Sequence, residues 1–237
     1  MTPYYQDEKA GVVIYCGDCR AILPMLPLPA ALCLTDIPYG EVNRASNGLR
    51  NLDKGDADTP TMPIEDVIQT LMPCGSSLYV RCGTEQVSSL RAAFVEGGLS
   101  TRLCVWEKSN PSPMNGQYIW LSAIEACVFA KRPKATFNEH CASPVWRGST
   151  QHSKDHPTQK PLWLFERLVS ASSLEGDLVI DPFMGSGTTL VAAKRLGRRA
   201  TGIEISEQYC EIAAKRLEAT ECQVLAQENS AMVGKVQ

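Results

Sequence analysis

Apolar positions along the chain follow two alternating patterns, short continuous runs and helical spacing. Short apolar runs typical of strands cover Val12–Tyr15, Ala31–Thr35, Ser77–Cys82, Leu99–Trp106, Ile124–Ala130, Leu178–Asp181 and Ala200–Ile205. Between them, apolar residues recur at helical spacing, as in Ile64, Val67, Ile68 and Leu71. This spacing and the turn residues predict helices at Pro63–Leu71, Glu85–Glu96, Pro161–Ser170, Thr188–Leu196 and Ser206–Leu217. Repeated β–α alternation predicts an α/β fold built on a mostly parallel sheet.

Two stretches, 40–60 and 133–156, lack periodicity and are rich in turn residues. Loops of this length in a compact domain are usually functional or disordered. We expect a single domain over residues 1–220 and a flexible tail over 221–237, with no internal repeat.

Composition is that of an ordinary globular protein, with 44% hydrophobic and 21% charged residues in 237. The polar N-terminus resembles no signal peptide, and no apolar run approaches the roughly 20 residues that span a bilayer. We therefore expect a cytosolic protein whose ten cysteines are free thiols, most of them in apolar runs. A zinc site at Cys16 and Cys19 would need a second ligand pair, which the sequence lacks.

A glycine turn follows the strand Leu178–Asp181. Gly185 and Gly187 allow a tight turn, and a helix beginning at Thr188 offers free N–H groups to an anion. Glu204 closes the next strand about 20 positions after Asp181, the spacing of a carboxylate that binds ribose hydroxyls in nucleotide-binding α/β folds. A phosphate-binding P-loop is excluded, because Thr188 stands where that motif has lysine. A merely structural turn is the alternative.

A second polar segment, Asp36-Ile37-Pro38-Tyr39, ends the apolar strand before it. It is compatible with an aspartate that caps a turn before proline. It is equally compatible with two acceptors, the Asp36 carboxylate and the Ile37 carbonyl, which would localise the lone pair of a base amino group. Pro38 would stiffen such a turn, and Tyr39 would stack on a base taken out of a duplex.

Asp36–Tyr39, the run His156–Pro161 and the run Asp181–Thr189, in this order, resemble the β group of DNA amino-methyltransferases. The resemblance extends from about Gly17 to Leu217. It implies a Rossmann-like methyltransferase sheet with circularly permuted motif order, a protein encoded by a bacterium or a phage, a restriction–modification context, double-stranded DNA as partner, and possible homodimers. Because the net charge is −3, contact with DNA would depend on a local surface and not on a basic protein overall. The stretches 40–60 and 133–156 are candidates for DNA recognition.

The resemblance also implies residue roles. Direct in-line transfer would use Asp36, Ile37, Pro38 and Tyr39 on adenine N6. S-adenosylmethionine would contact Asp18, Asp36, Thr158, Lys160, Asp181, Pro182, Phe183, Gly185, Ser186, Gly187, Thr188 and Glu204. Asp18 would approach the cofactor's adenine, Glu204 its ribose, and Thr158 with Lys160 its methionine end. Trp106–Lys108, together with Pro111 and Pro113, resembles the group's variable loop on the catalytic face.

The chain departs from the group at Ile37, where the pattern has proline, so some rigidity is expected to be lost. Three alternatives stay open: methylation of cytosine N4, an RNA substrate, and a cofactor-binding subunit without activity. A cytosine-C5 enzyme is disfavoured, because the dipeptide Pro73-Cys74 precedes the glycine turn instead of following it. The target sequence, and a role in defence, regulation or phage protection, are not readable.

Overall fold

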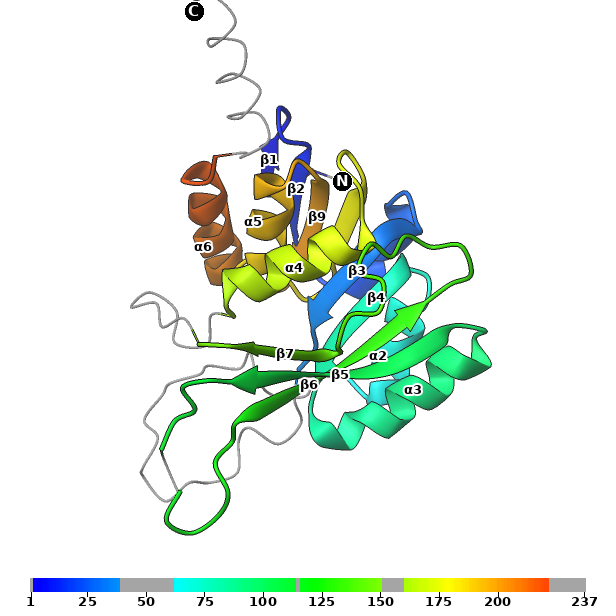
Figure 1. The fold of residues 1–237 in the computed structure, drawn as a ribbon. Coiled ribbons are helices and arrows are strands. Elements are labelled where there is room, and N and C mark those ends of the chain that lie inside the picture. Colours follow the sequence, from blue (N-terminus) through cyan, green and yellow to red (C-terminus); the bar gives the residue numbers. More distant parts are fainter. Residues whose placement is uncertain (1, 39–61, 114–115, 151–159, 222–237) are drawn as a thin grey trace, which may run out of the picture.

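Nine strands form one sheet in the computed structural model, which describes residues 2–38, 62–113, 116–150 and 160–221 (Figure 1). They are β1 (Tyr5–Asp7), β2 (Val12–Cys16), β3 (Ala30–Asp36), β4 (Gly75–Cys82), β5 (Ser100–Lys108), β6 (Ile124–Lys131), β7 (Val145–Gly148), β8 (Leu178–Asp181) and β9 (Arg199–Glu204). Their spatial order is β1-β2-β9-β8-β3-β4-β6-β5-β7. The run from β2 to β4 is parallel, whereas β6 is antiparallel to both β4 and β5. The prediction of a mostly parallel α/β sheet is confirmed.

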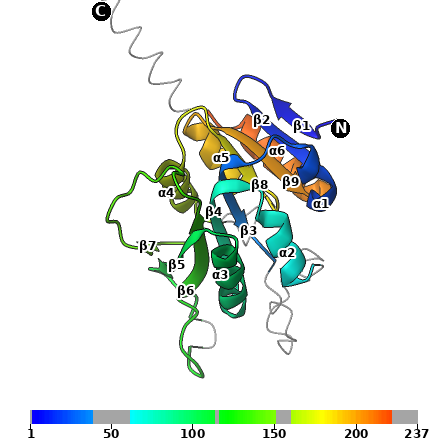
Figure 2. The same cartoon turned by 90° about the vertical axis from the view of Figure 1, so that its right-hand side faces the viewer.

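Helices cover both faces of this sheet. The helical elements are α1 (Cys19–Ile22), η1 (Leu23–Met25), α2 (Ile64–Leu71), η3 (Thr84–Gln86), α3 (Val87–Glu96), α4 (Leu162–Ser172), α5 (Thr188–Arg195) and α6 (Glu207–Glu218). One buried cluster joins the sheet to α4, α5 and α6, and a second joins it to α1, α2 and α3. Figure 2 shows α4 and α3 on opposite sides of the strands between them. The molecule is therefore a three-layer α/β/α structure.

The twelve predicted elements are present with bounds shifted by at most three residues. One prediction is wrong: the stretch 133–156, expected to be loop, contains the four-residue strand β7, paired with β5. Only Trp146 is buried in β7, so this short strand has no hydrophobic periodicity in its sequence. The segments 40–60 and 151–156 lie outside the described residues, as does nearly all of the predicted tail.

Strand direction brings the ends of β2, β9, β8, β3 and β4 to one side of the sheet, which we call the carboxyl edge. Ligands of open α/β sheets bind at this edge. The nine cysteines of the described ranges are free thiols, and seven of them are buried. Among the helices that the structure describes, none is long and apolar enough to cross a membrane.

Candidate active site

The segment Asp36-Ile37-Pro38 leaves the carboxyl edge directly from β3. Contacts with described residues hold it: the Asp36 carboxylate accepts from Lys160 Nζ at 3.0 Å, the Ile37 N–H donates to the Arg81 carbonyl at 3.1 Å, and the Pro38 carbonyl accepts from Gln86 Nε2 at 3.1 Å. No described residue donates to the Ile37 carbonyl oxygen. The backbone of this segment is therefore fixed on both sides of Ile37. Tyr39 lies outside the described residues.

Contacts made by Ile37 compensate for the rigidity that a proline would give at this position. Its N–H bond to the Arg81 carbonyl continues the β3–β4 pairing by one residue, and proline has no N–H to make such a bond. The side chain is 2% exposed and belongs to the core cluster that faces α1 to α3. Hydrogen bonding and burial of Ile37 thus supply the rigidity that we expected to be lost when proline is absent.

The glycine turn lies between β8 and α5, next to this segment. Gly185 and Gly187 both have positive φ, +49° and +78°, which side chains rarely adopt. Gly187 is the N-cap of α5, so the first N–H groups of that helix begin at the turn. The Gly185 N–H donates to Glu204 Oε2 at 3.0 Å, which ties the turn to the end of β9.

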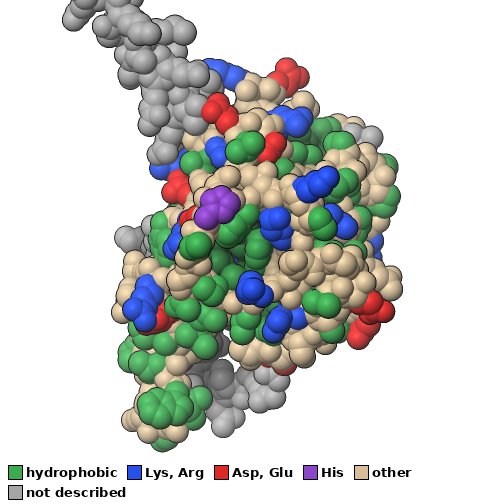
Figure 3. Space-filling model, turned by 45° about the vertical axis from the view of Figure 1, so that its right-hand side comes forward, with side chains coloured by type: hydrophobic (Ala, Val, Ile, Leu, Met, Phe, Trp, Pro, Cys, Tyr) green, Lys and Arg blue, Asp and Glu red, His purple; other side chains and the backbone are tan. Residues whose placement is uncertain are grey.

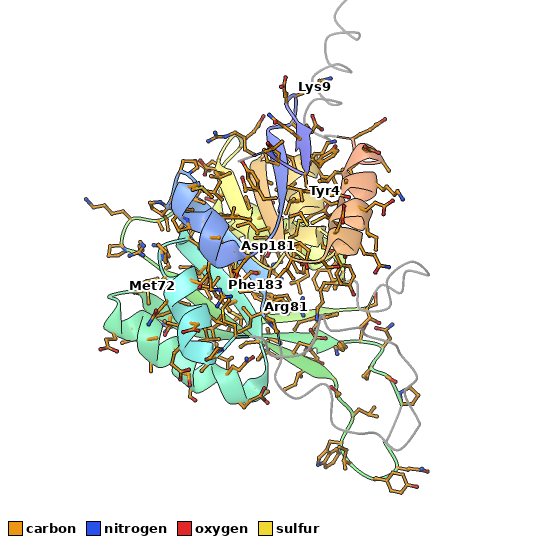
Figure 4. The ribbon with its side chains drawn as sticks, turned by 180° about the vertical axis from the view of Figure 1, so that it is seen from behind. Tyr4, Lys9, Met72, Arg81, Asp181 and Phe183 are labelled. Atoms are coloured by element: carbon orange, nitrogen blue, oxygen red, sulfur yellow. The ribbon has the colours of Figure 1, made fainter. Side chains whose placement is uncertain are left out.

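Asp181 joins the helix after the glycine turn to the end of β3. Its two carboxylate oxygens each accept a hydroxyl at 2.6 Å, one from Thr35 on β3 and one from Thr189 on α5. Burial raises the pKa of Asp181 to about 7, although the two threonine hydroxyls and the Phe183 N–H oppose this rise. The side chain of Asp181 is buried beneath the site, where its two hydrogen bonds link β3 to α5. Figure 4 shows Asp181, Phe183 and Arg81 in the same central region of the molecule.

Two further carboxylates lie at neighbouring strand ends. Glu204 accepts from the N–H groups of Gly185 and Ser206 at 3.0 and 2.9 Å, and burial raises its pKa. Asp18 follows β2, caps α1 through the Arg20 N–H at 2.9 Å, and forms an ion pair with the Arg20 guanidinium that lowers the pKa of Asp18. A bond from the Gly17 N–H to the Glu204 carbonyl at 2.8 Å brings the two loops together.

The remaining residues of the turn are held from α6. The Arg216 guanidinium donates to the Ser186 carbonyl, to Ser186 Oγ at 3.0 Å and to Thr188 Oγ1 at 3.3 Å. Pro182 is buried, and Phe183 is half-buried against the core cluster facing α1 to α3. Arg216 was not singled out in the sequence, because nothing local links it to a turn about 30 positions earlier.

Lys160 lies two residues before α4 and connects the segment at Asp36 to a group of charges. Besides Asp36, its ammonium contacts Glu125 Oε2 at 3.2 Å. Glu125 also pairs with Arg81, and with Lys108 at 2.7 Å. Sequence reasoning predicted Lys160 and Asp36 in the site but missed Glu125 and its partner Arg81. The available signal was a lone glutamate at the start of the apolar strand Ile124–Ala130.

The carboxyl edge has the features that S-adenosylmethionine requires. A glycine turn at β8 lets backbone approach closely, Glu204 presents a carboxylate suited to hydroxyl groups, and Asp18 presents another one strand further along. Asp36 emerges from the adjacent strand β3. Of the predicted site residues, the structure brings together those at or just after the ends of β2, β3, β8 and β9 and the one before α4; Tyr39 and Thr158 lie outside the described residues.

This fold and site define an α/β protein with a nucleotide-type cofactor site at the carboxyl edge of its sheet, beside an acidic segment at the end of β3. A family model described as DNA methylase, for N6 and N4 enzymes, matches residues 30–215, and the chain belongs to this family. It is a DNA methyltransferase whose cofactor is S-adenosylmethionine.

Two curated relatives span nearly the whole chain. The Type II methyltransferase M2.DpnII of Streptococcus pneumoniae is 30% identical over 250 residues, covering 92% of each protein. The Type II methyltransferase M2.LlaDCHI of Lactococcus lactis subsp. cremoris is 28% identical over 247 residues, covering 91% of each.

Solved structures show the same fold. The M1.HpyAVI–SAM complex aligns with a TM-score of 0.67 and 26% identity, covering 87% of this chain and 99% of the other. The cytosine-N4-specific PvuII DNA methyltransferase aligns with a TM-score of 0.70 over 90% of this chain and 88% of the other. At 17% identity, the latter shows likeness of fold alone.

Proposed function

We propose that the protein methylates N6 of adenine in double-stranded DNA by direct in-line transfer to a flipped base. The observation that carries this proposal is the fixed catalytic segment at the end of β3, where the Asp36 carboxylate and the Ile37 carbonyl stand beside the glycine turn. Aspartate at this position is typical of adenine enzymes in the β group that the sequence resembles, whereas serine is typical of cytosine-N4 enzymes.

The chemistry needs an oriented amino group. S-adenosylmethionine supplies an electrophilic methyl group when bound. Asp36 and the Ile37 carbonyl accept hydrogen bonds from the base amino group and localise its lone pair, which is otherwise delocalised into the ring. A carboxylate has about four lone-pair sites, so Asp36 can accept from Lys160 and from the base together. Rate enhancement then comes from positioning and fixed electrostatics, without a covalent enzyme intermediate.

For the cofactor, the proposed contacts keep the roles of the predicted residues: Gly185 to Thr188 line the turn, Glu204 binds the ribose, and Asp18 approaches the adenine. Tyr39 and Thr158 remain predictions from the sequence, as do homodimerisation and a cytoplasmic location. Asp181 contributes by holding β3, β8 and α5 in place, because its carboxylate is buried and occupied by two hydroxyls.

A DNA-facing surface is supported by the loop that joins β5 to β6, residues 109–123. Tyr118, Ile119 and Trp120 are exposed by 78, 69 and 96%, and the loop has no charged residue in its sequence. The loop begins after Lys108 and ends before Glu125, both in contact at the active site. Figure 3 shows hydrophobic side chains gathered at the tip of the molecule. An uncharged aromatic tip is suited to stacking on bases.

The test is transfer of tritium from labelled S-adenosylmethionine to unmethylated duplex DNA, followed by nucleoside analysis. We expect label in N6-methyladenosine. Label in N4-methylcytosine would keep the mechanism and reject the base, and preferential labelling of RNA of the same sequence would reject the polymer.

Asp36→Ala and Asp36→Asn should lower the rate by about 10²–10³-fold, in the range measured for removal of one oriented catalytic hydrogen-bonding group. Isothermal titration should find cofactor affinity nearly unchanged. Loss of cofactor binding, or full activity, in Asp36→Asn would contradict the role assigned to Asp36.

A further inference from the structure

We propose that Glu125 is a positioning residue for methyl transfer, which holds Lys160 against the catalytic carboxylate of Asp36. This inference rests on the proposed function, since it takes Asp36 as the group that contacts the base. None of the sequence motifs includes Glu125. Its part in the site follows from the way four strands and the start of α4 meet.

Strand register places the participants on one face of the sheet. Asp36 is paired with Arg81, and Arg81 with Cys127, so their side chains share a face. Glu125 lies two positions before Cys127 on β6 and therefore shares this face. It is the face covered by α4, which begins directly after Lys160 and Pro161. Carboxylates from β3 and β6 thus meet one ammonium group from the opposite layer.

The contacts of Glu125 divide between its two oxygens. Oε2 accepts from Lys160 Nζ at 3.2 Å and from Arg81, whereas Oε1 accepts from Lys108 Nζ at 2.7 Å. Arg81 cannot readily move, because its side chain is 1% exposed and its guanidinium lies over the rings of Trp106 and Phe165 at 5.4 and 5.6 Å. Glu125 is therefore fixed on the sheet side, and it offers Lys160 an anchor that does not depend on substrate.

Electrostatics keep this anchor charged. Burial alone would raise the pKa of Glu125, but the nearby cations Arg81, Lys160 and Lys108 outweigh it and lower the pKa to about 2. The cluster joins two carboxylates, Asp36 and Glu125, to three cations. Without the Glu125 charge, the three cations would repel one another and Lys160 would lose its contact with Glu125. Lysine has a long flexible side chain, so Lys160 would then hold the Asp36 carboxylate less firmly.

The experiment compares Glu125→Gln, Lys160→Met and the double variant, using single-turnover methylation of duplex DNA together with cofactor titration. We expect Glu125→Gln to lower the transfer rate by about 10–100-fold while the KM for DNA and the Kd for S-adenosylmethionine change by less than about threefold. In the Lys160→Met background, Glu125→Gln should add little further loss, because its effect passes through Lys160.

Glu139→Gln is the matched control. Glu139 makes a partly buried ion pair with Arg167 of α4 at 2.8 Å, about two turns beyond Lys160. The Glu139→Gln variant should be less stable than the wild type but should transfer methyl groups at the same rate. If Glu125→Gln does not fold, Glu125→Asp keeps the charge but shortens the reach, and we expect a folded protein with a reduced rate.

The inference is overturned if folded Glu125→Gln or Glu125→Asp transfers methyl groups at the wild-type rate, or if the losses in the double variant simply multiply. Those results leave the proposed function intact, provided that Asp36→Asn shows the loss of transfer rate expected above. Full activity of Asp36→Asn would instead remove the proposed function itself.

Discussion

Alanine at Gly187 tests how tightly the glycine turn is held against α6. A Cβ at Gly187 would lie 2.8 Å from Ala213 Cβ and 3.5 Å from its Cα, whereas a Cβ at Gly185 meets no heavy atom within 4 Å. Both glycines have positive φ, which costs other residues about 1–2 kcal/mol. Only Gly187→Ala adds overpacking, about 1–3 kcal/mol. We therefore expect losses of about 2–5 kcal/mol for Gly187→Ala and about 1–2 kcal/mol for Gly185→Ala.

The assay is urea unfolding followed by far-ultraviolet circular dichroism, with cofactor affinity measured by titration. Ala213→Gly removes the colliding methyl group and by itself costs about 1 kcal/mol of helix stability. Combined with Gly187→Ala, it should recover about 1–3 kcal/mol relative to the sum of the single changes. Gly185→Ala should weaken cofactor binding more than its small stability loss accounts for. Equal losses at both glycines, or no recovery from Ala213→Gly, would refute the reasoning.

Three further outcomes are expected. Arg216→Met should raise the Kd for S-adenosylmethionine by about tenfold with little change in transfer rate, because Arg216 holds Ser186 and Thr188; an unchanged Kd in a titration would contradict this. Trp120→Ala should weaken duplex binding in fluorescence anisotropy by about tenfold, the lower range for loss of base stacking, whereas the exposed Leu174, which precedes β8 at the opposite edge, should tolerate alanine. The pKa of Asp181 is raised in the folded protein, so protonation of this side chain stabilises the fold. The free energy of unfolding of the wild type, compared with that of Asp181→Asn, should therefore fall by about 1.4 kcal/mol per pH unit as the pH rises from 4 towards 7. Parallel curves of stability against pH would argue against the raised pKa.

The sequence predicted the parts of the site that lie in continuous motifs. Asp36–Pro38, the glycine turn and Glu204 could be assigned because strand, turn and helix follow one another within a few residues. The element pattern was readable for the same reason, since burial repeats with the period of the local structure. Strand β7 escaped because a four-residue edge strand with one buried side chain has no period.

Long-range contacts could not be predicted. The family resemblance places Lys160 at the methionine end of the cofactor, and this role stays a prediction. The contacts of its ammonium with Asp36 and Glu125 could not be read from the sequence. Those carboxylates are remote from each other in sequence, and only strand order and register bring them together. The compensation at Ile37 is of the same kind: it depends on the carbonyl of Arg81, a neighbour in space on β4.

Strand order also constrains how the nascent chain acquires this site. Strands β8 and β9 sit between β2 and β3, although they are made last. Until residues 178–204 have left the ribosome, β2 and β3 each present an unpaired edge, and the half-formed sheet has two surfaces open to other chains. Insertion of β8 and β9 closes both edges and assembles the glycine turn beside Asp36 in a single step. Catalytic competence and protection from aggregation should therefore arise together, late in synthesis.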